Sequence, residues 1–161
     1  MKSTFTRTLA IAGIAMTLSA GSALAHCQIP CGIYGDSGRF ETLHEHIRTV
    51  EKAMASITAL SAKETPNYNQ IARWVSNKEA HANAIQEIAL QYFLAQRVKP
   101  GVGDSDIYHA KLAALHEIIV YAMKSKQTTD VANAAKMRDA VKAFYTLYVG
   151  KPKTEGSGHK H

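Results

Sequence analysis

The chain lacks the patterns that indicate a β-sheet, a repeat protein or a nucleic-acid-binding protein. No segment of its 161 residues alternates apolar and polar side chains as a half-buried strand does, and no internal repeat is present. The formal net charge is only +6, and the longest stretch rich in basic residues is the C-terminal tail. The sequence therefore does not favour a nucleic-acid partner. With 46% hydrophobic residues, the chain is long enough to bury one core, and we expect one domain.

Cysteine is also scarce, since the sequence contains only Cys27 and Cys31. In an exported chain such a pair is ordinarily interpreted as one disulfide. A loop closed over three intervening residues would contribute little stability, because it constrains the unfolded chain only slightly. The alternative interpretation is a pair of thiolates that bind one metal ion.

Residues 1–25 have the composition of a signal peptide. Its parts are the basic residues Lys2 and Arg7, the apolar stretch Leu9–Leu18, and the A-x-A cleavage sequence Ala23-Leu24-Ala25. The apolar stretch is too short to span a membrane as a mature helix, and no twin arginine precedes it, which favours the general secretory route. We expect a mature chain that starts at His26, is not membrane-bound, and resides in the periplasm or outside the cell. Loss of the two basic residues lowers the formal charge from +6 to +4, and a mild positive field suits a small anionic partner.

Four segments of the mature chain show the three-and-four spacing of apolar residues that is typical of amphipathic helices. The first helix is expected from about Arg39, after a turn at residues 35–38, to about Ala62. The second, and longest, should begin near Ile71 and end at Lys99. The third and fourth should follow polar caps at residues 104–106 and 128–130. The apolar stripes are Phe40, Leu43, Ile47, Val50, Met54, Ile57 and Leu60; Ile71, Val75, Ala82, Ile85, Ala89, Tyr92 and Phe93, flanked by Trp74 and Ile88; Ile107, Leu112, Leu115, Ile119, Ala122 and Met123; and Val131, Ala134, Met137, Val141, Phe144 and Tyr148.

Four such helices joined by short loops predict an all-α fold, an antiparallel four-helix bundle. We assign residues 26–149 to this domain, which includes an N-terminal metal-binding hook. Residues 150–161 are rich in Gly, Pro and Lys and show no apolar period, so we expect a disordered tail.

The hook is the segment His26-Cys27-Gln28-Ile29-Pro30-Cys31-Gly32-Ile33-Tyr34. After cleavage, the α-amine of His26, the amide nitrogen of Cys27 and two thiolates form a planar set of nitrogen and sulfur donors. Ni(II) and Cu(II) prefer this geometry, whereas structural zinc sites are tetrahedral. Pro30 restricts the chain just before Cys31, and Gly32 lets the backbone pass close to the metal. The imidazole of His26 can then reach an axial position.

The motif His26-Cys27-x-x-Pro30-Cys31-Gly32-x-Tyr34 resembles the N-terminal nickel hook of the nickel superoxide dismutases. The resemblance extends to Gly35-Asp36, to Glu51-Lys52-Ala53-Met54, and to the helices that carry Trp74 and Tyr92-Phe93. It implies an enzyme that converts superoxide to oxygen and hydrogen peroxide while a nickel ion cycles between divalent and trivalent states. It also implies a symmetric homo-oligomer, a hexamer.

By the same resemblance, the amine of His26, the amide of Cys27 and the sulfurs of Cys27 and Cys31 are the equatorial ligands. The imidazole of His26 is the axial ligand of the oxidised state. Tyr34 should stand at the open face of the metal, where its hydroxyl orders water or the anion without binding nickel.

The family also holds the axial imidazole with a glutamate that is paired with a basic residue of a neighbouring subunit. Glu41 is the candidate for this glutamate, although the match needs a one-residue gap and Glu45 stays open. Lys78 and Arg73 are candidates for the basic partner. Gln28 departs from the acidic residue that other members often carry, which would reduce repulsion of superoxide.

Two other interpretations stay open on the residues alone. The chain could be a non-enzymatic nickel or copper carrier that uses the hook and the tail residues His159 and His161, or a bundle with a plain disulfide. Of the remaining histidines, His44 and His46 lie two apart on a helix and are expected to be solvated. His81, His109 and His116 are expected to be isolated polar or interface residues.

Overall fold

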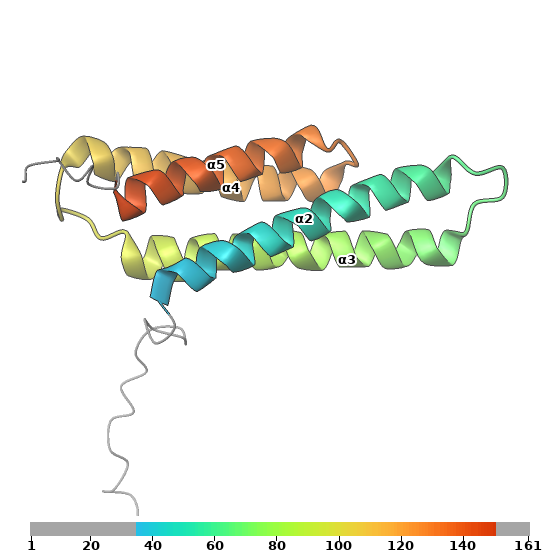
Figure 1. Cartoon of the computed structure of the whole chain (residues 1–161), viewed down its shortest axis with the longest axis horizontal. Helices are drawn as coiled ribbons and strands as arrows, with labels where there is room; N and C mark the ends of the chain where they lie inside the picture. Colours follow the sequence, from blue (N-terminus) through green and yellow to red (C-terminus); the bar gives the residue numbers. More distant parts are fainter. Residues whose placement is uncertain (1–34, 151–161) are drawn as a thin grey trace, which may run out of the picture.

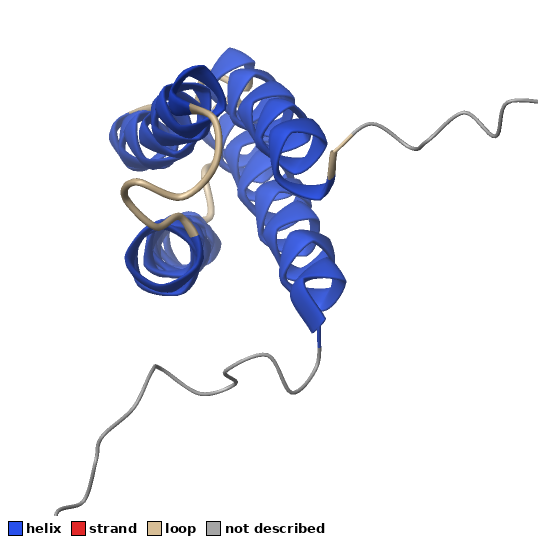
Figure 2. Ribbon diagram, turned by 90° about the vertical axis from the view of Figure 1, so that its left-hand side faces the viewer, coloured by secondary structure: helices blue, strands red, loops and turns tan. Residues whose placement is uncertain are grey.

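The structure is a computed structural model, and it describes residues 35–150. Its elements in chain order are α2 (Gly35–Ser61), α3 (Tyr68–Glu87), the π-helix η1 (Ile88–Arg97), α4 (Ser105–Gln127) and α5 (Ala132–Val149). Two antiparallel hairpins, α2 with α3 and η1, and α4 with α5, pack against each other (Figure 1). Figure 2 views the bundle from the end that lies on the left of Figure 1, and the part of the chain that the structure describes contains no strand. The expected all-α four-helix bundle is confirmed.

The core is formed by the apolar stripes of all four helices. Phe93 and Phe144 are the largest side chains that are fully buried, and their rings lie 5.0 Å apart in an edge-to-face arrangement. Phe40 contacts both rings, with centroid distances of 4.7 and 5.6 Å. Aromatic pairs of this kind add stability beyond that of buried area. These ring contacts therefore join α2, α5 and the π-segment η1 at one end of the bundle.

Four residues of the expected stripes are exposed, so their assignment to the core is wrong: Val75, Ile107, Met123 and Val131. The loop end of the α2–α3 hairpin extends beyond α4 and α5 (Figure 1), and Val75 lies in the first half of α3. Ile107 lies in the first turn of α4, and Val131 directly precedes α5. None of the helices within residues 35–150 is long and apolar enough to cross a membrane.

The expected turn at residues 35–38 is also wrong, because these residues form the first turn of α2. Asp36 suits this position, since a carboxylate near a helix N-terminus interacts favourably with the helix dipole. The cap of α4 agrees with the prediction: the side chain of Asp104 accepts hydrogen bonds from the amides of Asp106 and Ile107. Asn67 caps α3 in a similar way by accepting from the amide of Gln70.

The expected second helix is continuous from Tyr68 to Arg97, but its last ten residues have π-helical hydrogen bonding. At its end the amide of Val98 donates to the carbonyl of Phe93, five residues earlier, at 2.9 Å. Long π-segments are rare and frequently occur at functional sites. Here the segment carries both Tyr92 and Arg97, which contact the start of α2.

Candidate metal centre

The predicted ligands His26, Cys27 and Cys31, together with Tyr34, precede Gly35 and lie outside the described residues. Within residues 35–150 no group of three or more His, Cys, Asp or Glu side chains could hold a metal ion. Both cysteines of the chain belong to the hook. Thiolate, amine and imidazole donors suit nickel, so the residues of the hook fit this metal by their chemistry.

The hook joins the bundle at the start of α2, where Asp36 is surrounded by hydrogen-bond donors. The hydroxyl of Tyr92 donates to Oδ1 of Asp36 at 2.5 Å, and the hydroxyl of Tyr148 donates to Oδ2 at 2.6 Å. Nε of Arg97 forms an ion pair with Oδ1 at 3.2 Å. We call these four residues the Asp36 cluster. It fixes the second residue after Tyr34 to both η1 and α5.

The protonation states of the Asp36 cluster follow from these contacts. Burial alone would raise the pKa of Asp36, but the hydrogen bonds from Tyr148 and Tyr92 and the positive charge of Arg97 outweigh it and lower the pKa. Burial and the bond to the Asp36 carboxylate raise the pKa of Tyr148 far above its usual value. At neutral pH the cluster therefore holds an ionised carboxylate and a neutral Tyr148 hydroxyl.

Positive charge gathers around the same end of the bundle. The guanidinium groups of Arg39 and Arg97 lie 4.9 and 5.0 Å from the ring centroid of Tyr92. Arg97 also lines a cleft of about 400 Å³ together with Lys99 and Lys111. Asp36 and Asp104, which lines the same cleft, offset part of this charge, and the four basic residues still outnumber the two acidic ones. A net positive charge attracts small anions.

Glu41 lies on α2 and is exposed, as is Glu45 one turn further along. Among the described residues, the carboxylate of Glu41 has no hydrogen-bond or ion-pair partner. It is therefore available for a partner from the hook or from another subunit, but the contact predicted for it involves residues outside the described range.

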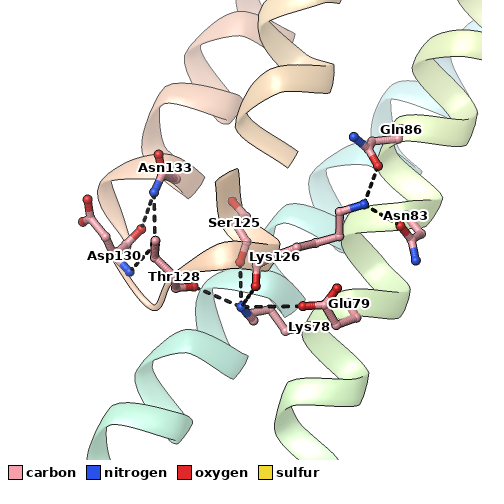
Figure 3. Close-up of polar contacts among 9 residues, drawn as sticks. All are labelled: Lys78, Glu79, Asn83, Gln86, Ser125, Lys126, Thr128, Asp130 and Asn133. Atoms are coloured by element: carbon pink, nitrogen blue, oxygen red, sulfur yellow. Dashed lines mark hydrogen bonds and ion pairs between the residues drawn. The ribbon is translucent and has the colours of Figure 1, made fainter. Parts of the chain in front are cut away.

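Lys78, one of the two candidates for the basic partner, is buried and already bonded within the chain (Figure 3). Its Nζ donates to the carbonyl oxygens of Ser125, Lys126 and Thr128 at 2.8, 2.6 and 3.0 Å. These carbonyls lie at the C-terminal end of α4, where a positive charge is favourable. Lys78 thus caps α4 and is not a suitable partner for a glutamate of another subunit, whereas Arg73 is exposed on α3.

The prediction that His46 is a solvated surface residue is wrong, and His81, expected to be an isolated polar or interface residue, contacts it. Their Nδ1 atoms are 2.8 Å apart, and both rings are partly buried between α2 and α3. A signal was present in the sequence, because the two residues lie at similar distances from the loop that joins these antiparallel helices. The Asp36 cluster had no such signal, since its partners lie 56 and 112 residues away.

Comparison with families of known proteins gives one result that bears on the hook. A family model with the description "Nickel-containing superoxide dismutase" matches residues 21–151. The matched range includes the hook and every helix of the bundle. Comparison with curated proteins and with solved structures gives no match.

Proposed function

Because the chain belongs to the nickel-containing superoxide dismutase family, we propose that its nickel ion is held at a processed N-terminus by the hook. Family membership makes the chain a nickel-dependent superoxide dismutase, with nickel as cofactor and superoxide as substrate. The proposed ligands are the amine and imidazole of His26, the amide of Cys27, and the sulfurs of Cys27 and Cys31. The observation that carries the proposal is the presence of both cysteines within this segment, inside the range that the family model matches.

When bound, the nickel supplies a one-electron couple, and thiolate and amidate donors make the trivalent state accessible. The residues of the chain attract and orient the substrate. Arg39 and Arg97 attract the superoxide anion to the end of the bundle from which the hook emerges. Tyr34 orders water or the anion beside the hook, in keeping with the donor and acceptor capacity of its hydroxyl.

The Asp36 cluster supports this function by fixing the chain where the hook begins. A ligand set on a short terminal segment is effective only if its attachment point is held in place. Asp36 is bound by two tyrosine hydroxyls and one arginine from two other elements of the bundle. We regard it as a positioning residue, since it lies on the bundle side of the hook.

We also propose that the enzyme is a homo-oligomer, a hexamer by family resemblance, in which Glu41 holds the imidazole of His26. Arg73 is the favoured basic partner from a neighbouring subunit, because Lys78 is engaged with α4. Two exposed apolar residues, Tyr68 and Val75, lie near Arg73 in the sequence of α3 and support a subunit contact on this part of the helix. Export to the periplasm or beyond the cell, with removal of residues 1–25, belongs to the same proposal.

Substitution of the two cysteines tests the ligand assignment. Cys27→Ser and Cys31→Ser should each lose stoichiometric nickel and dismutase activity, because a serine hydroxyl is a poor ligand for nickel at neutral pH. Ser37→Ala, an exposed change in the first turn of α2, is the matched control and should keep both. Full activity in either cysteine variant would refute the donor set. Nickel binding without turnover in the unmodified chain would instead favour a carrier.

A further inference from the structure

A second group of metal-binding side chains lies outside the hook, between α2 and α3. Nδ1 of His46 and Nδ1 of His81 are 2.8 Å apart, and the ring centroids are 4.9 Å apart with the rings steeply inclined to each other. In the metal-free chain one proton is shared between the two nitrogens. Once that proton leaves, both nitrogens are close enough to bind one ion.

The two histidines are flanked by fully buried residues of the α2–α3 hairpin. On α2, His46 lies between Leu43 and Ile47, which are 0% and 1% exposed. On α3, His81 is followed by Ala82 and Ile85, both 0% exposed. Well-packed neighbours of this kind restrict the side chains to few positions. The distance between the imidazoles is therefore set by helix packing and does not depend on a mobile loop.

The distance matches a particular coordination geometry. Two nitrogens that are each about 2.0 Å from one ion are about 2.8 Å apart when they occupy neighbouring corners of a square, and about 3.3 Å apart at a tetrahedral angle. Square-planar and tetragonal coordination by nitrogen and oxygen is typical of Cu(II) and Ni(II), whereas zinc prefers the tetrahedral arrangement. The 2.8 Å between the Nδ1 atoms of His46 and His81 is the length of the hydrogen bond that joins them, and it is closer to the separation at neighbouring corners of a square than to the tetrahedral one.

We propose that His46 and His81 bind a second divalent metal ion, Ni(II) or Cu(II), with solvent oxygens in its other positions. When the ion binds, the ring that donates takes the other tautomer: its Nδ1 proton leaves to solvent and its Nε2 takes one up, so both imidazoles stay neutral and both Nδ1 lone pairs face the ion. Both imidazoles are only partly buried, and His46, though not His81, lines a pocket of about 260 Å³ together with Arg39, Thr42 and Glu87, so an ion can approach from the His46 side.

Nickel binding to the nickel-loaded protein tests the proposal. The experiment uses chains with His159→Gln and His161→Gln, so that tail residues do not contribute, and counts bound Ni²⁺ by equilibrium dialysis. We expect one further equivalent per chain beyond the ion of the hook. His46→Gln or His81→Gln should weaken this second binding at least about tenfold, because one of the two protein ligands is lost. Zn²⁺ should bind more weakly than Ni²⁺.

The matched control is His44→Gln, a partly buried histidine on the same helix that does not contact His81. It should leave the second equivalent unchanged. Absence of a second equivalent in the parent chain, or equal loss in the His44 and His46 variants, would overturn the proposal. If a histidine variant fails to fold, a measurement on the parent chain still tests the proposal. Cu(II) added to the nickel-loaded parent chain should give a tetragonal electron paramagnetic resonance spectrum with splitting from two nitrogens, and a spectrum without nitrogen splitting would contradict it.

Discussion

Replacing Asp36 by asparagine removes the charge at the centre of the Asp36 cluster while keeping the size of the side chain. The carboxylate accepts hydrogen bonds from Tyr92 and Tyr148 at 2.5 and 2.6 Å and faces Arg97 at 3.2 Å. An asparagine has one acceptor oxygen, so its amide group must face a hydroxyl or the guanidinium. A hydrogen bond to a charged group contributes about 1.5–3 kcal/mol. Because the Asp36 side chain is 30% exposed, we expect a loss near the lower end, about 2 kcal/mol.

This loss should appear as a decrease in Tm of about 6–8 °C for a chain of this size. Thermal and urea unfolding, followed by circular dichroism, measure it. The pH dependence provides a second signature. Since the folded-state pKa of Asp36 lies below its ordinary value of 3.8, its contribution is present above that pH and is lost as the pH falls through the folded-state pKa. The difference between the parent chain and the variant should therefore shrink in strong acid.

Asp139→Asn is the matched control for this experiment. Asp139 is exposed on α5 and has no hydrogen-bond or ion-pair partner among the described residues. Its substitution should change the free energy of unfolding by less than about 0.5 kcal/mol. Equal effects of the two substitutions, or a stability of Asp36→Asn equal to that of the parent chain, would refute the role assigned to the cluster.

Two other predictions concern the interior of the bundle. Lys78→Met should lower the free energy of unfolding by about 2–3 kcal/mol, because three carbonyl oxygens at the end of α4 lose their donor. The same substitution at the exposed Lys142 should have little effect. Similar urea midpoints for the two variants would argue against the role of Lys78 as a cap. Burial lowers the pKa of His46 below its ordinary value of 6.5, so the unfolded chain binds a proton first and stability should decrease as the pH falls from about 7 to 5. His46→Gln should flatten this decrease in a series of urea titrations at different pH. An unchanged dependence of the free energy of unfolding on pH would show that the burial of His46 does not cause it.

The fold was predictable because each helix buries one apolar stripe. Residues such as Leu43, Ile47 and Met137 recur at helical spacing and are fully buried in the structure. The cap of α4 was predictable from Asp104 for a similar, local reason. Contacts within a few residues and one period therefore determine the number, order and approximate ends of the helices.

The parts that could not be predicted depend on contacts between distant residues. The π-segment η1 has the same apolar period as the helix before it and no Gly or Pro to mark the change. Lys78 is buried although lysine is almost never fully buried, because carbonyls almost fifty residues away need a donor. Asp36 and the pair His46–His81 likewise acquire their partners only when the helices pack.

The hook itself was recognised from a motif, and its nickel chemistry depends on a bond that is intact in the encoded sequence. The amine ligand exists only if the peptide bond between Ala25 and His26 is cut. Mass spectrometry and N-terminal sequencing of the active, nickel-containing protein measure this directly. We expect a chain that begins with His26, whereas an active nickel enzyme that begins at any other residue would contradict the proposed ligand set.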